Sequence, residues 1–429
     1  MEKRIACHTL GCKVNQYDTE AMLERFEDAG WQRVGTGEPA EVYLINTCTV
    51  TGTGDQKSLK LIRRIHREHP DSAIVVCGCL AQRDAGRVML PGVKLVVGTK
   101  RRADVVSLLE QALAGDGCLC AVDTGGTWSF ENLSVSRHEG RTRAVMKIQE
   151  GCDRFCSYCV IPYVSGPVRS MPLEAVRGEA ERLCLAGYRE IVVNGIHLAS
   201  YGRGEGVTLA DALRACAAPE GIRRVRLGSL EPTVVTDEFV KELLAIPEIC
   251  PQFHLSMQSG SEAVLRRMHR RYTPEGYLEA ARRLQEAWNP AAVTTDVLTG
   301  FPGETDEEAL ETEAFIEKVG FARIHVFPYS RRAGTLADRM PGQVPESVKQ
   351  YRAGRLIEIG NRMKDSFVKA LLGSTREVLF ETALGDGRSE GYTPEFVRVR
   401  ANGAPGEIRP VRLTGIEDGV LTGEAGAVR

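Results

Sequence analysis

From residue 144 onward, short apolar runs alternate with amphipathic helical segments, and this alternation constrains the fold more than any other feature of the chain. Strands joined by helical crossovers pair in parallel, so the pattern predicts an α/β fold with a parallel sheet. The strand–helix units are too few to close an eight-stranded barrel, and we therefore predict a partial (βα)6 barrel with a wide lateral opening. The predicted strands cover residues 144–148, 191–193, 225–227, 254–256, 295–298 and 324–326.

The remaining sequence predicts two further folded units, as expected for a chain of 429 residues. Residues 1–115 alternate strands with helices and predict an open α/β sheet, in which Asp18 caps the first helix. Residues 116–137 are rich in Gly, Asp, Thr and Ser, lack apolar periodicity, and predict a linker to the barrel unit at 138–370. Residues 371–429 contain short strands between Gly-containing turns, and they predict a small antiparallel β-barrel, a fold that often binds oligonucleotides.

The composition excludes several classes of protein. With 43% hydrophobic and 26% charged residues, the chain is expected to be a soluble globular protein without a membrane partner. No export signal follows Met1, so we expect a cytoplasmic protein whose 13 cysteines are reduced thiols or metal ligands. The net charge of −2 provides no general attraction to nucleic acid, so any RNA contact must use local basic faces.

A loop directly after the first predicted barrel strand contains Cys152, Cys156 and Cys159. The spacing Cys-x3-Cys-x2-Cys can place three thiolates on three corners of a cubane iron–sulfur cluster, which usually has four protein ligands. The fourth iron would stay open to bind a small molecule and pass it an electron, much as a catalytic zinc keeps one position open. The alternative, three buried structural cysteines, does not require this spacing in a glycine-flanked loop.

Three more cysteines, Cys12, Cys48 and Cys79, each lie just past the carboxyl end of a predicted strand in the N-terminal unit. Ligands bind at that edge of an open α/β sheet, so the three thiols can converge on a second cluster. Ordinary buried cysteines are the alternative, and spacing alone does not decide between the two. Cys77 alternates with Cys79 and would point to the opposite face of a strand. We assign Cys79 to the cluster because it follows Gly78 and lies nearer the loop, and we place Cys77 in the core.

Loops at the carboxyl ends of the barrel strands carry further candidate binding residues. Ser229, Glu231 and Gln258 can form hydrogen bonds with a nucleoside or an amino-acid group. Glycines in the run 300–303 would let the backbone approach a ligand closely. Each feature has a simpler alternative, since Glu231 can cap a helix that starts at Pro232 and the glycine run can be a tight turn.

Two other features remain open between a functional and a structural role. His197 fits either proton transfer or a structural hydrogen bond. The basic run 266–271 fits either phosphate contact or a solvated helix face.

The cysteine loop resembles the signature of the radical S-adenosylmethionine enzymes, and the order of the three units resembles one family among them, the methylthiotransferases. That family has an N-terminal three-cysteine domain, a radical core and a C-terminal TRAM domain, so the resemblance covers nearly the full chain. Besides the Cys152, Cys156, Cys159 loop, it rests on Gly11-Cys12, Asn46-Thr47-Cys48, Gly78-Cys79, Ser229-Leu230-Glu231-Pro232, Gln258-Ser259-Gly260-Ser261 and Gly300-Phe301-Pro302-Gly303-Glu304-Thr305.

The resemblance implies two 4Fe-4S clusters and S-adenosylmethionine as cofactors. One cluster would be held by Cys152, Cys156 and Cys159, with S-adenosylmethionine on its open iron. The other would be held by Cys12, Cys48 and Cys79, which the resemblance makes cluster ligands. The residues expected to contact S-adenosylmethionine are Tyr158, Gly195, Ser229, Glu231, Gln258 and Gly303.

Within the family, the run Cys12-Lys13-Val14-Asn15-Gln16 resembles the branch that acts on N6-threonylcarbamoyladenosine next to the anticodon of tRNA. The implied reaction uses a 5′-deoxyadenosyl radical to remove hydrogen from C2 of the adenine, which then receives a methylthio group. The implied partners are tRNA, S-adenosylmethionine, an electron donor and a sulfur donor. The alternatives are the same chemistry on N6-isopentenyladenosine in tRNA or on a ribosomal protein aspartate, and a non-catalytic RNA-binding iron–sulfur protein.

Overall fold

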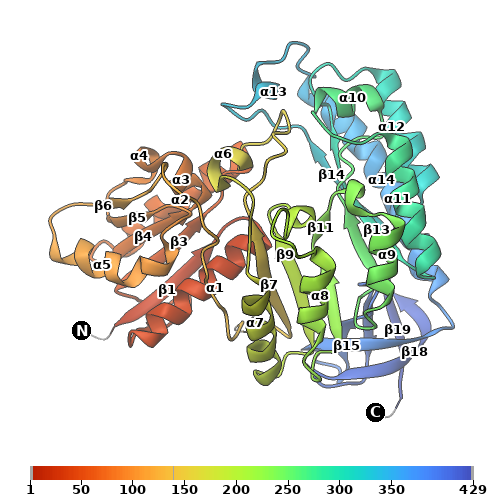
Figure 1. Cartoon of the computed structure of the whole chain (residues 1–429), viewed down its shortest axis with the longest axis horizontal. Coiled ribbons are helices and arrows are strands. Elements are labelled where there is room, and N and C mark those ends of the chain that lie inside the picture. Colours follow the sequence, from red (N-terminus) through yellow and green to blue (C-terminus); the bar gives the residue numbers. More distant parts are fainter. Residues whose placement is uncertain (1–2, 139, 427–429) are drawn as a thin grey trace.

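The computed structural model describes residues 3–138 and 140–426, which form three units in sequence order (Figure 1). A parallel sheet forms the N-terminal unit, a partial barrel forms the centre, and a small closed barrel lies beneath the central strands. No helix within these residues is long and apolar enough to cross a bilayer.

The N-terminal unit is a six-stranded sheet in the order β2-β1-β3-β4-β5-β6, and its pairings are parallel. The central strands β3 (Val42–Thr47) and β4 (Ala73–Gly78) are buried along their whole length, because apolar cores cover both faces of the sheet. β6 lies inside the segment predicted as a linker, where only one of its three residues is buried. The other strands are β1 (Arg4–Thr9), β2 (Gln32–Arg33), β5 (Val93–Val97) and β6 (Leu119–Ala121).

The first helix does not begin where the sequence indicated. Its N-cap residue is Cys12, whose side chain makes no capping hydrogen bond, so the prediction of Asp18 as the cap is wrong. Asp18 is instead buried in the middle of the helix and pairs with Arg102 and Lys147, which are distant in sequence. The helices of this unit are α1 (Lys13–Asp28), α2 (Gly52–Glu68), α3 (Cys79–Arg83), α4 (Ala85–Val88) and α5 (Val105–Ala114), with a 3-10 turn at Arg102–Asp104.

The central unit is a partial barrel built from two four-stranded sheets, β10-β9-β7-β8 and β11-β12-β13-β14. The six predicted strands are all present, and neighbours among them pair in parallel within each sheet. They are β7 (Arg143–Glu150), β9 (Glu190–Gly195), β10 (Arg224–Leu227), β12 (Gln252–Leu255), β13 (Ala292–Thr299) and β14 (Arg323–Pro328). The two-residue strands β8 (Arg169–Ser170) and β11 (Ser229–Leu230) are too short for a sequence pattern to indicate.

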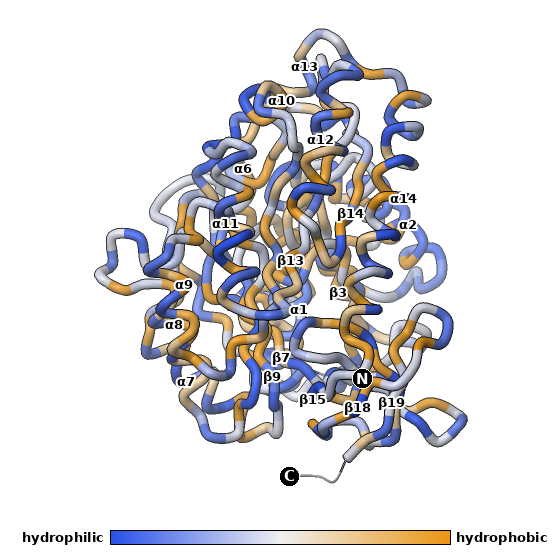
Figure 2. The backbone as a smooth tube through the Cα atoms, turned by 90° about the vertical axis from the view of Figure 1, so that its right-hand side faces the viewer, coloured by the Kyte–Doolittle hydropathy of each residue, from blue (hydrophilic) through white to orange (hydrophobic). Residues whose placement is uncertain are grey.

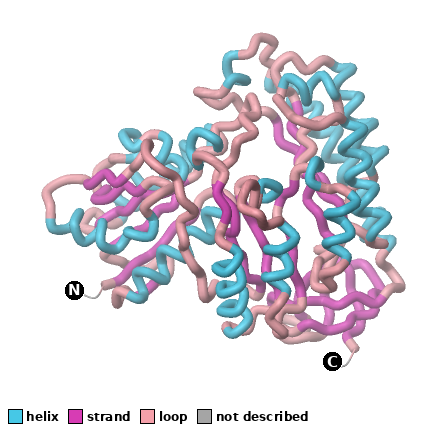
Figure 3. Tube along the Cα trace, in the orientation of Figure 1, coloured by secondary structure: helices cyan, strands magenta, loops and turns pink. Residues whose placement is uncertain are grey.

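Helices cover the outer face of the partial barrel, while the strands form its inner layer (Figure 3). Hydrophobic segments concentrate in the interior, for example along β13 (Figure 2). One apolar cluster that includes Ile148, Val193, Phe253 and Leu284 joins the strands to the helices. The helices are α6 (Ile161–Ser165), α7 (Leu173–Leu185), α8 (Leu209–Ala217), α9 (Asp237–Leu244), α10 (Glu262–Arg267), α11 (Pro274–Ala287), α12 (Asp306–Val319), α13 (Leu336–Arg339) and α14 (Glu346–Ala370), with 3-10 turns at Leu198–Ser200 and Pro232–Val234.

The C-terminal unit is a closed barrel in the order β15-β16-β17-β19-β18. Its pairings are antiparallel, as predicted, except for the parallel pair β17 and β19. Arg224 and Arg226 on β10 donate hydrogen bonds to the backbone carbonyls of Tyr392, Glu377 and Pro394 at 3.0, 2.8 and 2.8 Å. This contact docks the barrel under the amino ends of the central strands. The strands are β15 (Thr375–Ala383), β16 (Ser389–Tyr392), β17 (Arg398–Ala401), β18 (Ile408–Glu417) and β19 (Val420–Ala425).

Candidate active site

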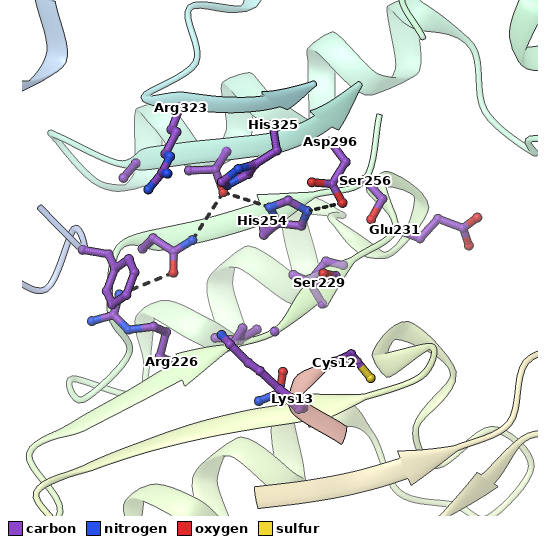
Figure 4. A pocket seen from close by; sticks show the side chains of 18 of the residues that line it. Cys12, Lys13, Arg226, Ser229, Glu231, His254, Ser256, Asp296, Arg323 and His325 are labelled. Atoms are coloured by element: carbon purple, nitrogen blue, oxygen red, sulfur yellow. Dashed lines mark hydrogen bonds and ion pairs between the residues drawn. The ribbon is translucent and has the colours of Figure 1, made fainter. Parts of the chain in front are cut away.

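A cavity of about 900 Å³ lies where the three units meet. Its lining comes from the start of α1, the cysteine loop after β7, the inner faces of the barrel strands and the C-terminal barrel. Figure 4 shows Cys12 and Lys13 on one wall of the cavity, with His254, Asp296 and His325 on the opposite wall. Side chains of all three units therefore share one space.

The loop that carries Cys152, Cys156 and Cys159 depends on the backbone of Gly151. This glycine has a φ of +74°, and a Cβ here would lie 1.8 Å from the carbonyl oxygen of Pro167. Glycine is the residue that tolerates both conditions. The Cys159 amide donates to the Cys156 carbonyl at 2.9 Å, which closes the turn. All three thiols line the cavity.

Arg270 provides positive charge at this loop. Its Nη1 lies 3.3 Å from Cys156 Sγ, and its guanidinium lies 4.9 Å from the centre of the Tyr272 ring. Burial raises the pKa of Cys159 to about 12, which favours the neutral thiol until a metal displaces the proton. A cation beside the thiols offsets part of that preference, since it stabilises thiolates.

The arginines of the basic run 266–271 do not share one role, so neither phosphate contact nor a solvated helix face describes the whole run. Arg266 is exposed and pairs with Glu262, whereas Arg267 pairs with Glu308 at 2.6 Å. Arg270 points inward to the cysteine loop. Spacing along the chain did not distinguish these side chains, because their partners come from other elements.

Cys12, Cys48 and Cys79 follow β1, β3 and β4, which are neighbours in the sheet, and the three residues lie close together. Asn15 Oδ1 is 3.9 Å from both Cys12 Sγ and Cys79 Sγ. A Cβ on Gly11 would lie 3.2 Å from Cys48 Sγ. The three thiols are thus gathered at the carboxyl edge of the sheet, at the start of α1.

Cys77 points away from this edge. It is fully buried in the core with Leu44 and Val75, and its Sγ lies 3.7 Å from the carbonyl oxygen of Ile45. This placement favours Cys79 as the third member of the N-terminal set.

The donor sets fit clusters better than single metal ions. Within the described residues, no group of three or more His, Cys, Asp or Glu side chains is arranged to hold one metal ion. A cubane cluster requires a different ligand geometry, because each thiolate binds a separate iron and the thiols surround the cluster. Cys12 lines the same cavity as Cys152, Cys156 and Cys159, while Cys48 and Cys79 do not reach its lining. This arrangement fits two clusters that face a common space.

Glu231 joins several charged side chains beside the cavity. Its carboxylate lies 2.6 Å from Arg154 Nη2, 3.1 Å from His197 Nε2 and 3.8 Å from Arg270 Nη2. Burial acts to raise the pKa of Glu231, but the His197 hydrogen bond and the charges of Arg270 and Arg154 outweigh it and lower that pKa to about 2. Glu231 therefore stays ionised at neutral pH and orients its neighbours.

His197 has partners on both ring nitrogens. Nε2 faces Glu231, and Nδ1 contacts the hydroxyl of Ser200. Both ring nitrogens therefore have hydrogen-bond partners, as the structural role requires, and His197 also lines the cavity.

The structure brings most of the predicted S-adenosylmethionine contacts together. Tyr158, Gly195, Ser229, Glu231 and Gln258 all line the cavity. Gly303 does not, and its amide donates instead to the carbonyl of Gly342 at 2.8 Å.

Sequence reasoning missed a group of cations in the same cavity. Lys13, Arg323 and Lys364 line it and come from α1, β14 and α14. The one available signal was the position of Lys13 beside Cys12; nothing near Arg323 or Lys364 in the sequence indicates a shared site.

Comparison with known families identifies the class of protein. The model of the Radical SAM superfamily matches residues 146–316, and that of the Uncharacterized protein family UPF0004 matches residues 4–98. The fold is similar to that of TsrM from Kitasatospora setae, a radical S-adenosylmethionine methyltransferase, with a TM-score of 0.58 and 14% identity over 79% of this chain and 77% of that chain. The fold and the cysteine loop are those of a radical S-adenosylmethionine protein.

Curated relatives narrow this class. The chain is 41% identical over 403 residues to the threonylcarbamoyladenosine tRNA methylthiotransferase MtaB of Bacillus subtilis, covering 92% of this chain and 89% of the relative. It is 36% identical to the protein of the same name from Thermotoga maritima, covering 99% and 98%. The tRNA-2-methylthio-N(6)-dimethylallyladenosine synthase of Pelotomaculum thermopropionicum is 34% identical, covering 98% and 97%. The chain belongs to the family of radical S-adenosylmethionine tRNA methylthiotransferases.

Proposed function

We propose that this protein inserts a methylthio group at C2 of N6-threonylcarbamoyladenosine in tRNA. The observation that carries the proposal is the shared cavity, which contains Cys12 from one set of cysteines and all three cysteines of the other. A base held between the two sets would face both at once. The relatives named for threonylcarbamoyladenosine, at 41% and 36% identity, support this substrate.

The chain's own residues bind and orient the reactants. Cys152, Cys156 and Cys159 would hold one 4Fe-4S cluster, and Cys12, Cys48 and Cys79 the other. When bound, the clusters and S-adenosylmethionine would supply the electron, the means of removing the C2 hydrogen, and both the sulfur and the methyl of the methylthio group. Tyr158, Gly195, Ser229 and Gln258 are proposed to contact S-adenosylmethionine, with Glu231 holding Arg154 and His197 in place. Gly303, which lies outside the cavity lining, is left out of this set.

The docked C-terminal barrel supports the reaction by closing the lower end of the cavity. Arg226 donates to the Pro394 carbonyl at 2.8 Å, and its guanidinium lies 4.8 Å from the centre of the Phe396 ring. Limiting the access of water protects a reactive intermediate from quenching.

Two further partners belong to the proposal, an electron donor and a sulfur donor, and we place the reaction in the cytoplasm with its tRNA substrate. A second candidate is the same chemistry on the dimethylallyl-substituted adenosine. The relative from Pelotomaculum thermopropionicum, which is named for that nucleoside, favours it.

Mass spectrometry of tRNA nucleosides tests the proposal in cells that lack this protein and in cells to which it is restored. We expect 2-methylthio-N6-threonylcarbamoyladenosine to disappear and return. If that nucleoside persists while the dimethylallyl counterpart disappears, the second candidate is correct. If neither nucleoside changes, both assignments are wrong.

A further inference from the structure

The cavity contains more positive charge than its own carboxylates balance. Two of the three carboxylates in its lining pair with an arginine: Glu231 with Arg154, and Glu395 with Arg376 at 3.1 Å. The third, Asp296, lies 3.4 Å from His254, a side chain that is charged only when protonated. By contrast, the side chains of Lys13, Arg323 and Lys364 form no ion pair or hydrogen bond within residues 3–138 and 140–426. Unpaired cations that line a cavity are suited to bind an anionic part of a ligand.

Lys13 lines the cavity, and its side chain is exposed to solvent. It directly follows Cys12, and its side chain extends across the cavity toward Arg226 (Figure 4). Arg323 projects from the first position of β14 on the opposite wall (Figure 4).

The position of Lys13 relative to Cys12 fits the geometry of the proposed substrate. If the cluster on Cys12, Cys48 and Cys79 serves C2 of the adenine, the residue after Cys12 lies near the C2 edge of the ring. C2 and C6 flank the same ring nitrogen, so a long side chain beside C2 can reach the substituent on C6. The threonylcarbamoyl substituent ends in a carboxylate, whereas the dimethylallyl substituent has no charge.

We propose that Lys13, with Arg323 on the opposite wall, binds the carboxylate of the N6-threonylcarbamoyl group and so selects this nucleoside over apolar N6-substituted adenosines. The inference rests on the proposed function and adds the residues that recognise the substrate. A backbone phosphate of the same RNA is the other source of an anion, and the test distinguishes the two.

The test measures binding of anticodon stem-loops to the reconstituted full-length protein, without S-adenosylmethionine or reductant, so that no turnover occurs. Three stem-loops of one sequence carry N6-threonylcarbamoyladenosine, N6-dimethylallyladenosine or unmodified adenosine. The variants are Lys13→Gln, Lys13→Arg and Arg323→Gln. Lys318→Gln, on the exposed side of α12, is the matched control because it also removes one positive charge. Since Lys13 and Arg323 have no protein partner within the described residues, their replacement leaves no buried group unpaired.

We expect Lys13→Gln to weaken binding of the threonylcarbamoyl stem-loop at least about tenfold more than binding of the other two, the loss expected for one charge-assisted contact. Arg323→Gln should reduce the same preference, while Lys13→Arg and Lys318→Gln should keep it. Equal weakening of all three stem-loops would overturn the inference in favour of a phosphate contact. An unchanged preference in Lys13→Gln would overturn it as well. If the unaltered protein itself shows no preference for the threonylcarbamoyl stem-loop, the proposed function fails rather than the assignment of Lys13 alone.

Discussion

Glu179 on α7 is a buried carboxyl group that accepts a hydrogen bond from the hydroxyl of Tyr17 on α1 at 3.0 Å. Burial raises the pKa of Glu179 to about 8, even though the Tyr17 hydrogen bond and the charge of Arg182 favour the ionised form. At neutral pH the folded protein therefore keeps a proton on a group that is ionised in the unfolded chain.

The raised pKa predicts how stability depends on pH. The unfolded chain releases this proton first as pH rises, so the group lowers the stability of the protein between about pH 4.5 and pH 8. Glu179→Gln cannot ionise, and the variant should lie within about 1 kcal/mol of the unaltered protein near pH 5 and exceed its free energy of unfolding by about 4 kcal/mol at pH 8. Urea unfolding at both pH values measures the difference, with the exposed Glu181→Gln on the same helix as control. A difference that does not grow with pH would contradict the raised pKa.

At the scale of elements, the loop between β7 and α6 depends on one backbone conformation. Gly151→Ala introduces a Cβ that would lie 1.8 Å from the Pro167 carbonyl, at a φ of +74°. We expect the loop to move and its three cysteines to lose their common geometry. Iron and sulfide analysis after anaerobic reconstitution should then give about half the iron of the unaltered protein, because the cluster proposed for the N-terminal set would be retained.

Gly178→Ala, in the interior of α7, is the control, since its added Cβ would approach only the flexible end of Arg182 at 3.5 Å. Full iron content in Gly151→Ala would show that the loop tolerates the change.

The elements differ in how far the sequence could predict them. The main barrel strands were predictable, because short strand-like runs alternate with amphipathic helical segments along this part of the chain. β6, β8 and β11 were not, since each is two or three residues long. The start of α1 was missed because Cys12 occupies the cap position without a capping hydrogen bond. Asp18 resembled a cap residue, but its partners Arg102 and Lys147 lie 84 and 129 residues away, and such pairings leave no local pattern.

The candidate site was likewise predictable from the sequence only in part. Cysteine spacing indicated the loop at Cys152, and the strand-end positions indicated Cys12, Cys48 and Cys79. The environment of these residues was not predictable from local sequence. Arg270 lies beside Cys156 only in the folded protein, and Arg323 lines the cavity from a different sheet.

At the scale of the whole molecule, a buried charge cluster connects the N-terminal sheet to the partial barrel. Arg102 contacts Asp18, Glu131 and Glu150, with distances of 2.7 Å to both glutamates. Lys147 lies 2.5 Å from Asp18 and 2.6 Å from Glu150. Asp18 lies on the helix that starts after Cys12, and Glu150 directly precedes the loop of Cys152, so the cluster fixes one cysteine-bearing element relative to the other.

Arg102→Met tests this connection. The change leaves three carboxylates, of which Asp18 and Glu150 are buried, with less positive charge, and we expect it to lower the free energy of unfolding by about 3–5 kcal/mol. Arg101→Met is the control, because Arg101 makes an exposed pair with Asp104 at 3.1 Å. Its replacement should lower the free energy of unfolding by less than about 1 kcal/mol. Urea unfolding of both variants measures the contrast, and similar small losses would show that the cluster does not hold the units together.

The docking of the C-terminal barrel has a consequence for how such a protein can change over evolutionary time. Arg224 and Arg226 bind the barrel through the backbone carbonyls of Tyr392, Glu377 and Pro394. Every amino acid has a backbone carbonyl. Substitutions on the barrel that preserve its backbone path therefore leave these hydrogen bonds intact. Many outward side chains of the barrel can therefore be exchanged while these backbone contacts to the central unit remain.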